Sequence, residues 1–232
     1  MRFMWYRFVR LVHSAGDRLV STVLGTESAE RGKGLAFAAT RSAMGAGDQA
    51  AGQEKSMQTV AILCAARNSV YKTLRAVDVY DEQRDARTFP GGMPVVAHPP
   101  CRLWSAFCRH QAKSPDPETE MDLGLWCVEQ VQRCGGVLEQ PAHSGLFEMA
   151  GVVPTVTLCQ SDWGHTEIKA TWLYVRGCGG QFPPLPRLRG VAGSRRKWQR
   201  KSKNQRSATP PDFAHWLVDL ARMCSPAQEV LR

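Results

Sequence analysis

The sequence has no apolar run that approaches the length of a membrane span, which needs roughly 18 residues or more. Its eight cysteines in 232 residues are too few and too unevenly spaced for a disulfide scaffold. No internal repeat is present. These absences argue against membrane-spanning and disulfide-stapled proteins. They predict a cytoplasmic protein with free thiols and no membrane partner.

Acidic residues are missing from the segment 189–206, RGVAGSRRKWQRKSKNQR, which holds eight Lys or Arg residues. The formal net charge of the whole chain is +9, so subtracting these eight leaves +1 for all other residues. A segment of this kind suits a phosphate backbone. It predicts DNA as a partner, bound through Arg195, Arg196, Lys197 and Arg200. A solvated loop without a ligand is the alternative interpretation.

The composition and the hydrophobic pattern of the sequence change near residue 57. Residues 1–56 are rich in Ala, Gly, Ser and charge and show no lasting period after about residue 25, which predicts a largely disordered N-terminal extension. Residues 1–24 alone could form an amphipathic basic helix. We expect an α/β core over 57–188 and the basic segment over 189–208. A C-terminal helix over 209–232 is expected to pack on the core of a monomer.

Short, continuous apolar runs indicate strands of a parallel sheet that is buried on both faces. They lie at 59–66, 76–81, 94–101 and 136–141, and the segments 156–160 and 171–175 resemble an antiparallel pair. Helices are expected over 115–136 and 209–224, the second capped by Thr209. The fold class is therefore α/β. We expect a doubly wound, mostly parallel, Rossmann-like sheet with a short antiparallel extension.

Two of these strands end in a proline beside a residue that can carry chemistry. The run VVAHPPC ends in Cys101, and GVLEQP contains Glu139. Ligands of parallel α/β sheets bind beyond the carboxyl ends of strands, so we expect this thiol and this carboxylate to face one crevice. A thiolate added to C6 of cytosine makes C5 nucleophilic, and an acid at N3 eases the addition. The pair predicts modification of a flipped pyrimidine base.

The residues at these strand ends resemble a known family. The stretch PPCRLWS (99–105) is similar to the Pro-Cys-x-x-aromatic-Ser motif of DNA (cytosine-5) methyltransferases. Leu138-Glu139-Gln140-Pro141 is similar to the Glu-Asn-Pro motif of that family, with Gln140 in the place of Asn. The stretches from Trp163 to His165 and from Lys169 to Leu173 resemble the corresponding part of small phage-borne members. The likeness covers roughly residues 59–175 and also extends to phage and prophage proteins.

The resemblance implies a doubly wound fold, S-adenosylmethionine as cofactor and a covalent adduct of Cys101 to the base, with Glu139 activating that base. It implies that base or backbone is held by Arg102, Ser105, Lys169 and Thr171. The cofactor would be faced by Asp81, Asp85 and Pro99. For a phage-encoded chain, the compartment is the cytoplasm of the bacterial host.

The chain also departs from this family. The usual first motif is a strand followed by Phe-x-Gly-x-Gly, whereas TVAILCAARNSVYKTL contains no glycine. Without glycine, the backbone approaches a cofactor less closely. The closing Gly-Asn-Ala/Ser-Val motif is absent too. The sequence therefore does not identify the group that is transferred to the base.

Two other functions fit the same sequence. One is a non-catalytic phage DNA-binding protein on a degenerate methylase fold. The other is a small zinc module whose soft ligands are His98, Cys101, Cys108 and His110. The remaining cysteines are interpreted as buried and inert, among them Cys64 and Cys127.

Overall fold

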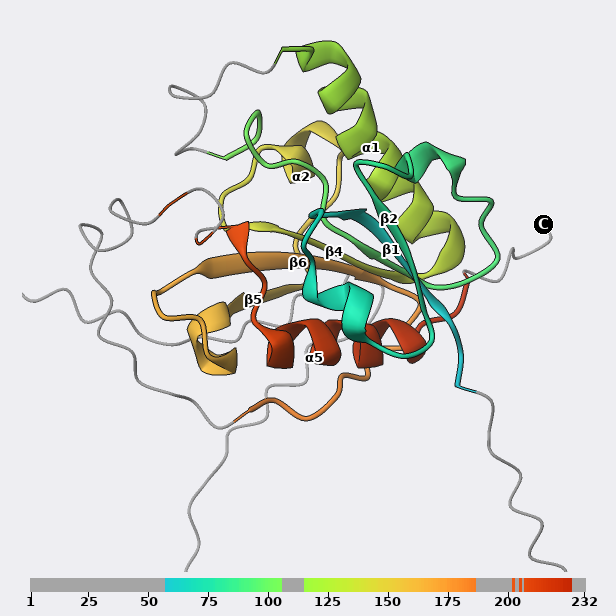
Figure 1. Ribbon diagram of the computed structural model, residues 1–232, viewed down its shortest axis with the longest axis vertical. Coiled ribbons are helices and arrows are strands. Elements are labelled where there is room, and N and C mark those ends of the chain that lie inside the picture. Colours follow the sequence, from blue (N-terminus) through green and yellow to red (C-terminus); the bar gives the residue numbers. More distant parts are fainter. Residues whose placement is uncertain (1–56, 106–114, 187–201, 203–204, 206, 227–232) are drawn as a thin grey trace, which may run out of the picture. The chain divides into compact units, whose positions relative to one another are not determined.

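A computed structural model describes residues 57–105, 115–186, 202, 205 and 207–226 of the chain. These residues form a mixed sheet of six strands between helices (Figure 1). The strands are β1 (Val60–Ala65), β2 (Val77–Asp81), β3 (Val95–Ala97), β4 (Gly136–Pro141), β5 (Val156–Cys159) and β6 (Ala170–Arg176).

The strand order is β2-β1-β3-β4-β6-β5. The first four strands are parallel, while β6 runs antiparallel to both β4 and β5. The order reverses between β1 and β3, which is the point where open α/β sheets form a crevice beyond their strand ends. The expected fold class, with its short antiparallel extension, is confirmed.

One long helix lies on each face of the sheet (Figure 1). Helix α1 (Pro117–Cys134) starts at Asp116, whose side chain accepts a hydrogen bond from the Thr119 amide. It ends at Gly135, which takes a positive φ of 75°. Helix α5 (Pro211–Arg222) begins after Pro210. Thr209 is therefore not the cap, because the Pro-Pro pair places the first turn one residue later.

The two faces of the sheet carry separate hydrophobic clusters. Val60, Ile62, Val96 and Val137 pack with α5, whose buried stripe includes Phe213, Trp216, Leu217 and Leu220. On the other face, Ala61, Leu63, Val95, Ala97 and Leu138 pack with α1 through Val128 and Val131. Alternate residues of each strand thus enter opposite clusters, as the period of a strand dictates.

The crossovers around β1 and β2 contain only short 3₁₀ turns. These turns are η1 (Val70–Thr73) and η2 (Ala86–Thr88), and a short helix α2 (Leu146–Met149) and a turn η3 (Gln160–Trp163) follow β4 and β5. Within the described ranges, no helix has both the length and the apolar character that crossing a membrane requires.

Candidate active site at the carboxyl edge of the sheet

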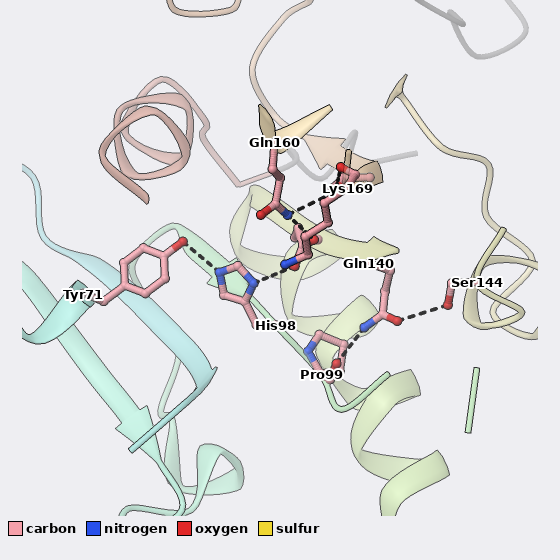
Figure 2. Close-up of polar contacts among 9 residues, drawn as sticks. Tyr71, His98, Pro99, Gln140, Ser144, Gln160 and Lys169 are labelled. Carbon is pink, nitrogen blue, oxygen red and sulfur yellow. Dashed lines mark hydrogen bonds and ion pairs between the residues drawn. The ribbon is translucent and has the colours of Figure 1, made fainter. Parts of the chain in front are cut away.

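Polar side chains from five segments meet at one edge of the sheet, on the α5 side (Figure 2). They come from η1, from the ends of β3 and β4, from the start of β6 and from η3. This edge holds the carboxyl ends of the parallel strands. We call the set the charged network, and it consists of Tyr71, His98, Glu139, Gln160, Lys169 and Thr171.

Glu139 is the centre of the charged network. Glu139 lies in β4, and the residue is 7% exposed. Oε2 lies 3.0 Å from Nδ1 of His98, and Oε1 accepts a hydrogen bond of 2.9 Å from Nε2 of Gln160. Burial opposes ionisation of this carboxyl, but Lys169, His98 and Thr171 outweigh it and lower its pKa. Glu139 is therefore a carboxylate at neutral pH.

His98 links Glu139 to a buried phenol. Its Nε2 lies 2.8 Å from the hydroxyl of Tyr71, whose side chain is 1% exposed. Because a carboxylate only accepts hydrogen bonds, Nδ1 of a neutral His98 donates to Glu139 and Nε2 accepts from Tyr71. Burial and the nearby charge of Glu139 raise the pKa of Tyr71, so the phenol keeps its proton. The partners of the ring thus fix one tautomer.

Gln160 and Thr171 close the other side of the charged network. Nε2 of Gln160 also donates to Oγ1 of Thr171, at 3.0 Å, and both side chains are fully buried. Thr171 in turn donates to the backbone carbonyl of Lys169. Oε1 of Gln160 is buried and has no hydrogen-bond partner among the residues that the structure describes. The network thus holds an acceptor that a donor from outside it could use.

A second set of contacts lies beside the charged network and carries no charge (Figure 2). Gln140 donates from Nε2 to the carbonyl oxygen of Pro99 at 2.6 Å, and its Oε1 accepts from the hydroxyl of Ser144 at 3.1 Å. We call Pro99, Gln140 and Ser144 the neutral network. It fixes the backbone two residues before Cys101, so Gln140 positions the loop of the expected nucleophile.

Cys101 begins a tight turn after β3. Its carbonyl oxygen accepts from the amides of Trp104 and Ser105, at 3.2 and 2.8 Å. The Cys101 side chain is partly exposed, whereas Ser105 is buried. Nε of Arg102 contacts both carboxylate oxygens of Glu120 in the first turn of α1, at 2.8 and 2.7 Å. This ion pair, which sequence reasoning missed, ties the turn to α1.

The acids expected to face a cofactor are engaged within the chain. Oδ2 of Asp81 pairs with Lys72 at 2.5 Å, and Oδ1 accepts from the amides of Gln83 and Arg84. The hydrogen bond from Lys72, with those from the backbone, lowers the pKa of Asp81 to about 2. Asp85 caps η2 by accepting from the amide of Arg87. Both carboxylates thus stabilise turns.

The fit to S-adenosylmethionine is poor among the described residues. Every residue from Ala66 to Ser69, after β1, carries a side chain, and the ring of Tyr71 contacts His98, which follows β3. The loop after β1 thus lacks the glycine that lets a backbone approach a cofactor closely. Pro99, too, offers its carbonyl to Gln140.

The zinc interpretation finds no support where the chain is described. In that part, no three His, Cys, Asp or Glu side chains gather so that they could hold a metal ion. Both ring nitrogens of His98 already contact Tyr71 and Glu139. Cys108 and His110 lie outside the described residues, as do the N-terminal extension and the cationic residues Arg195, Arg196, Lys197 and Arg200.

Sequence reasoning missed Tyr71 and Gln160 and considered His98 only as a metal ligand. Tyr71 lies in RNSVYKTL, a stretch without a motif, so no local signal marks it. A local signal did mark His98. This residue directly follows a buried strand and precedes two prolines, at the sheet edge where ligands of α/β folds bind.

Comparison with known proteins gives no family for this chain: no protein-family model matches it, and neither does any curated protein. The likeness to cytosine-5 methyltransferases thus stays a prediction from its motifs. The geometry of the edge must carry any proposal about function.

Proposed function

We propose that this protein is an enzyme that modifies a cytosine base in DNA, with Cys101 as nucleophile and Glu139 as the group that holds the base. One observation carries the proposal. Glu139 is a buried carboxylate in a strand that pairs directly with β3, through Ala97 and Leu138, and β3 leads into Pro-Pro-Cys101. An ionised carboxylate in a buried position is costly unless it is paired and has a use there.

The chemistry follows from the charge of Glu139. A carboxylate accepts hydrogen bonds, and the 4-amino group of cytosine is a donor where thymine and uracil offer an oxygen. Glu139 therefore selects cytosine. The Cys101 thiolate adds to C6, the electron pair of the C5–C6 bond moves onto C5, and C5 then attacks an electrophilic carbon of a one-carbon donor. The leaving group of that donor departs with the electron pair of the bond that breaks. Loss of the C5 proton and expulsion of the thiolate restore the ring.

The charged network holds Glu139 in place for this cycle. Nδ1 of His98 donates its proton to Oε2 of Glu139 in a hydrogen bond of 3.0 Å, which stabilises the carboxylate as an acceptor for the base. Tyr71 holds His98 in the orientation that this hydrogen bond needs. His98 and Tyr71 are positioning residues in this scheme, since they act through Glu139.

The proposal assigns no described residue to the donor of the new group. S-adenosylmethionine stays a prediction of the resemblance, and calorimetric titration of the full chain tests it. Because Asp81 and Asp85 are already used by turns, we expect no binding at micromolar concentrations. Saturable binding of S-adenosylmethionine at micromolar concentrations would contradict this expectation and would support S-adenosylmethionine as the methyl donor.

The binding of DNA rests on charge. The eight cations of 189–206 predict an affinity for duplex DNA that falls steeply with salt, because bound phosphates release counterions. Replacing Arg195, Arg196, Lys197 and Arg200 by Gln should weaken binding and flatten the slope of log affinity against log salt. An unchanged slope contradicts this role.

Covalent trapping tests the nucleophile. A duplex that contains 5-azacytosine has a more electrophilic C6, so thiol addition gives an adduct that intact-mass spectrometry detects. We expect the adduct with the wild-type chain and its loss in Cys101→Ser. Cys159→Ser is the matched control, because Cys159 is likewise partly exposed and in no disulfide, and it should keep the adduct.

Two results separate the alternatives. No adduct, with DNA affinity unchanged in Cys101→Ser, contradicts catalysis and favours a non-catalytic DNA-binding protein. If the adduct forms, mass spectrometry of nucleosides from DNA of cells that express the chain identifies the transferred group by its mass.

A further inference from the structure

The end of β1 contains a bulge at Cys64. The pairing of β1 with β2 joins Ile62 to Val79 and Ala65 to Asp81, so β1 has one extra residue between these pairs. Cys64 takes a φ of 60°, in the left-handed region that residues with a side chain rarely occupy. The strand is therefore strained at a cysteine, and strain of this kind concentrates at functional sites.

The bulge changes the face to which Cys64 belongs. Ile62 packs with the α5 cluster and Leu63 with the α1 cluster, so regular alternation would place residue 64 on the α5 side. Cys64 instead packs with the α1 cluster, next to Leu63, and Ala65 joins the α5 cluster. The extra residue thus turns the thiol toward α1.

A second thiol lies where Cys64 points. Sγ of Cys64 is 3.6 Å from Sγ of Cys127, a fully buried residue in the middle of α1. A disulfide needs about 2.05 Å between the sulfur atoms, so they must approach by roughly 1.5 Å. The two residues are 63 positions apart in the sequence, and the contact joins the central part of the sheet to the helix that covers it.

We propose that Cys64 and Cys127 form a reversible, peroxide-sensitive dithiol that closes to a disulfide between β1 and α1. Hydrogen peroxide oxidises the partly exposed Cys64 thiol to a sulfenic acid, and the other oxygen of the peroxide leaves as water. The Cys127 thiol attacks the sulfenic sulfur, the S–S bond forms, and the sulfenic oxygen leaves as a second water with the Cys127 proton. A dithiol reductant reverses the step by exchange.

This inference does not depend on base modification. It uses no residue of the charged or neutral network, and it assigns a use to two cysteines that the sequence suggested were inert. Disulfides of cytosolic proteins are in general transient and serve to sense the redox state, which fits a pair held close but unbonded. When closed, the bond fixes α1 to the strained end of β1.

Peptide mapping of the full chain tests the pair. The protein is treated with hydrogen peroxide and then denatured in urea, where its free thiols are blocked with N-ethylmaleimide. It is digested without reductant for mass spectrometry. We expect a peptide that links Cys64 to Cys127 and disappears after dithiothreitol. The oxidised chain should also melt roughly 5 to 10 °C higher, because a bond across so long a loop restricts the unfolded chain.

Matched variants define the result. Cys134→Ala removes another buried thiol of α1 and should leave the linked peptide in place, while Cys64→Ser should leave Cys127 free for alkylation. A sulfinic acid on Cys64 without any linked peptide overturns the proposal. So does a disulfide found only between Cys178 and Cys224, the other buried thiols that interact.

Discussion

Two neighbouring residues of β4, Glu139 and Gln140, lead into two networks of opposite character. Glu139 shares a face with Val137 and lies on the α5 side with Tyr71, whereas Gln140 shares a face with Leu138 on the α1 side. The charged network links groups that can gain or lose protons. The neutral network links an amide, a hydroxyl and a carbonyl, none of which titrates at ordinary pH.

This difference separates two tasks at one edge of the sheet. The neutral network has all its groups paired in a fixed geometry, so it can hold the loop that carries Cys101 at any pH. The charged network is built around an ionised carboxylate, so its hydrogen bonds change when Glu139 is protonated at low pH. A buried charge and the positioning of a loop thus lie on opposite faces of one strand.

The largest difference in unfolding free energy is expected when Glu139 of the charged network and Gln140 of the neutral network are each replaced by Ala. Glu139→Ala removes a buried carboxylate and leaves His98, Gln160 and Lys169 without their partner, which should cost about 3–5 kcal/mol of unfolding free energy. Gln140→Ala leaves the Pro99 carbonyl without a donor and should cost about 1–3 kcal/mol. Urea denaturation of both variants measures the two values. Equal costs contradict the distinction between the networks.

A smaller difference in unfolding free energy is expected at Tyr71, which contacts His98, and at Ser144, which contacts Gln140. Tyr71→Phe leaves Nε2 of His98 as a partly buried acceptor without its donor and should cost about 1–2 kcal/mol. Ser144→Ala removes a weaker contact of 3.1 Å and should cost about 1 kcal/mol. Tyr71→Phe should also slow adduct formation on 5-azacytosine DNA, because His98 loses its fixed tautomer. Thermal unfolding and the trapping rate are the two measurements.

The pH dependence of stability separates the networks further. The pKa of a Glu side chain in the unfolded chain is about 4.3. The pKa of Glu139 in the folded chain lies below that value. Its contribution to stability is therefore complete above this value and is lost as the pH falls through the folded-state pKa. The stability advantage of wild type over Glu139→Gln should shrink in that range, by at most about 1.4 kcal/mol for each unit of pKa difference. The advantage over Gln140→Ala should stay flat.

The smallest effect is expected from Lys169, which is partly exposed and acts through its charge. Lys169→Gln removes that charge, so the pKa of Glu139 should rise above its value in the wild-type chain. Carbon-detected NMR titration of the Glu139 carboxyl measures the change. Ser144→Ala is the control and should leave this pKa in place. A pKa that does not move in Lys169→Gln excludes Lys169 from the charged network.

The sequence predicted the strands of the core closely, because residues buried on both faces must be continuously apolar. VAILCA and VVA are such runs, and prolines mark the stops of two strands, just after β3 and at the last residue of β4. The same logic placed Cys101 and Glu139 at one edge. It could not show that Glu139 and Gln140 serve different networks, because that depends on what each face packs against.

The partners of the site were beyond the reach of local sequence. Tyr71 reaches His98 from a 3₁₀ turn 27 positions earlier, and Arg102 reaches Glu120 from 18 positions away. The resemblance implied that Asp81 and Asp85 face a cofactor, yet the turns after β2 use both carboxylates. Such contacts are decided by the geometry of the crossovers, which residue types alone do not specify.

By itself, the sequence determined the layers of the fold, the strand ends and the concentration of positive charge in one segment. These follow from burial and charge, which are properties of each stretch of chain. Only the tertiary structure decided that Glu139 is held as a carboxylate, that Gln140 holds the Cys101 loop and that Cys64 faces Cys127. These depend on register, on a one-residue bulge and on desolvation, which arise only when distant segments pack together.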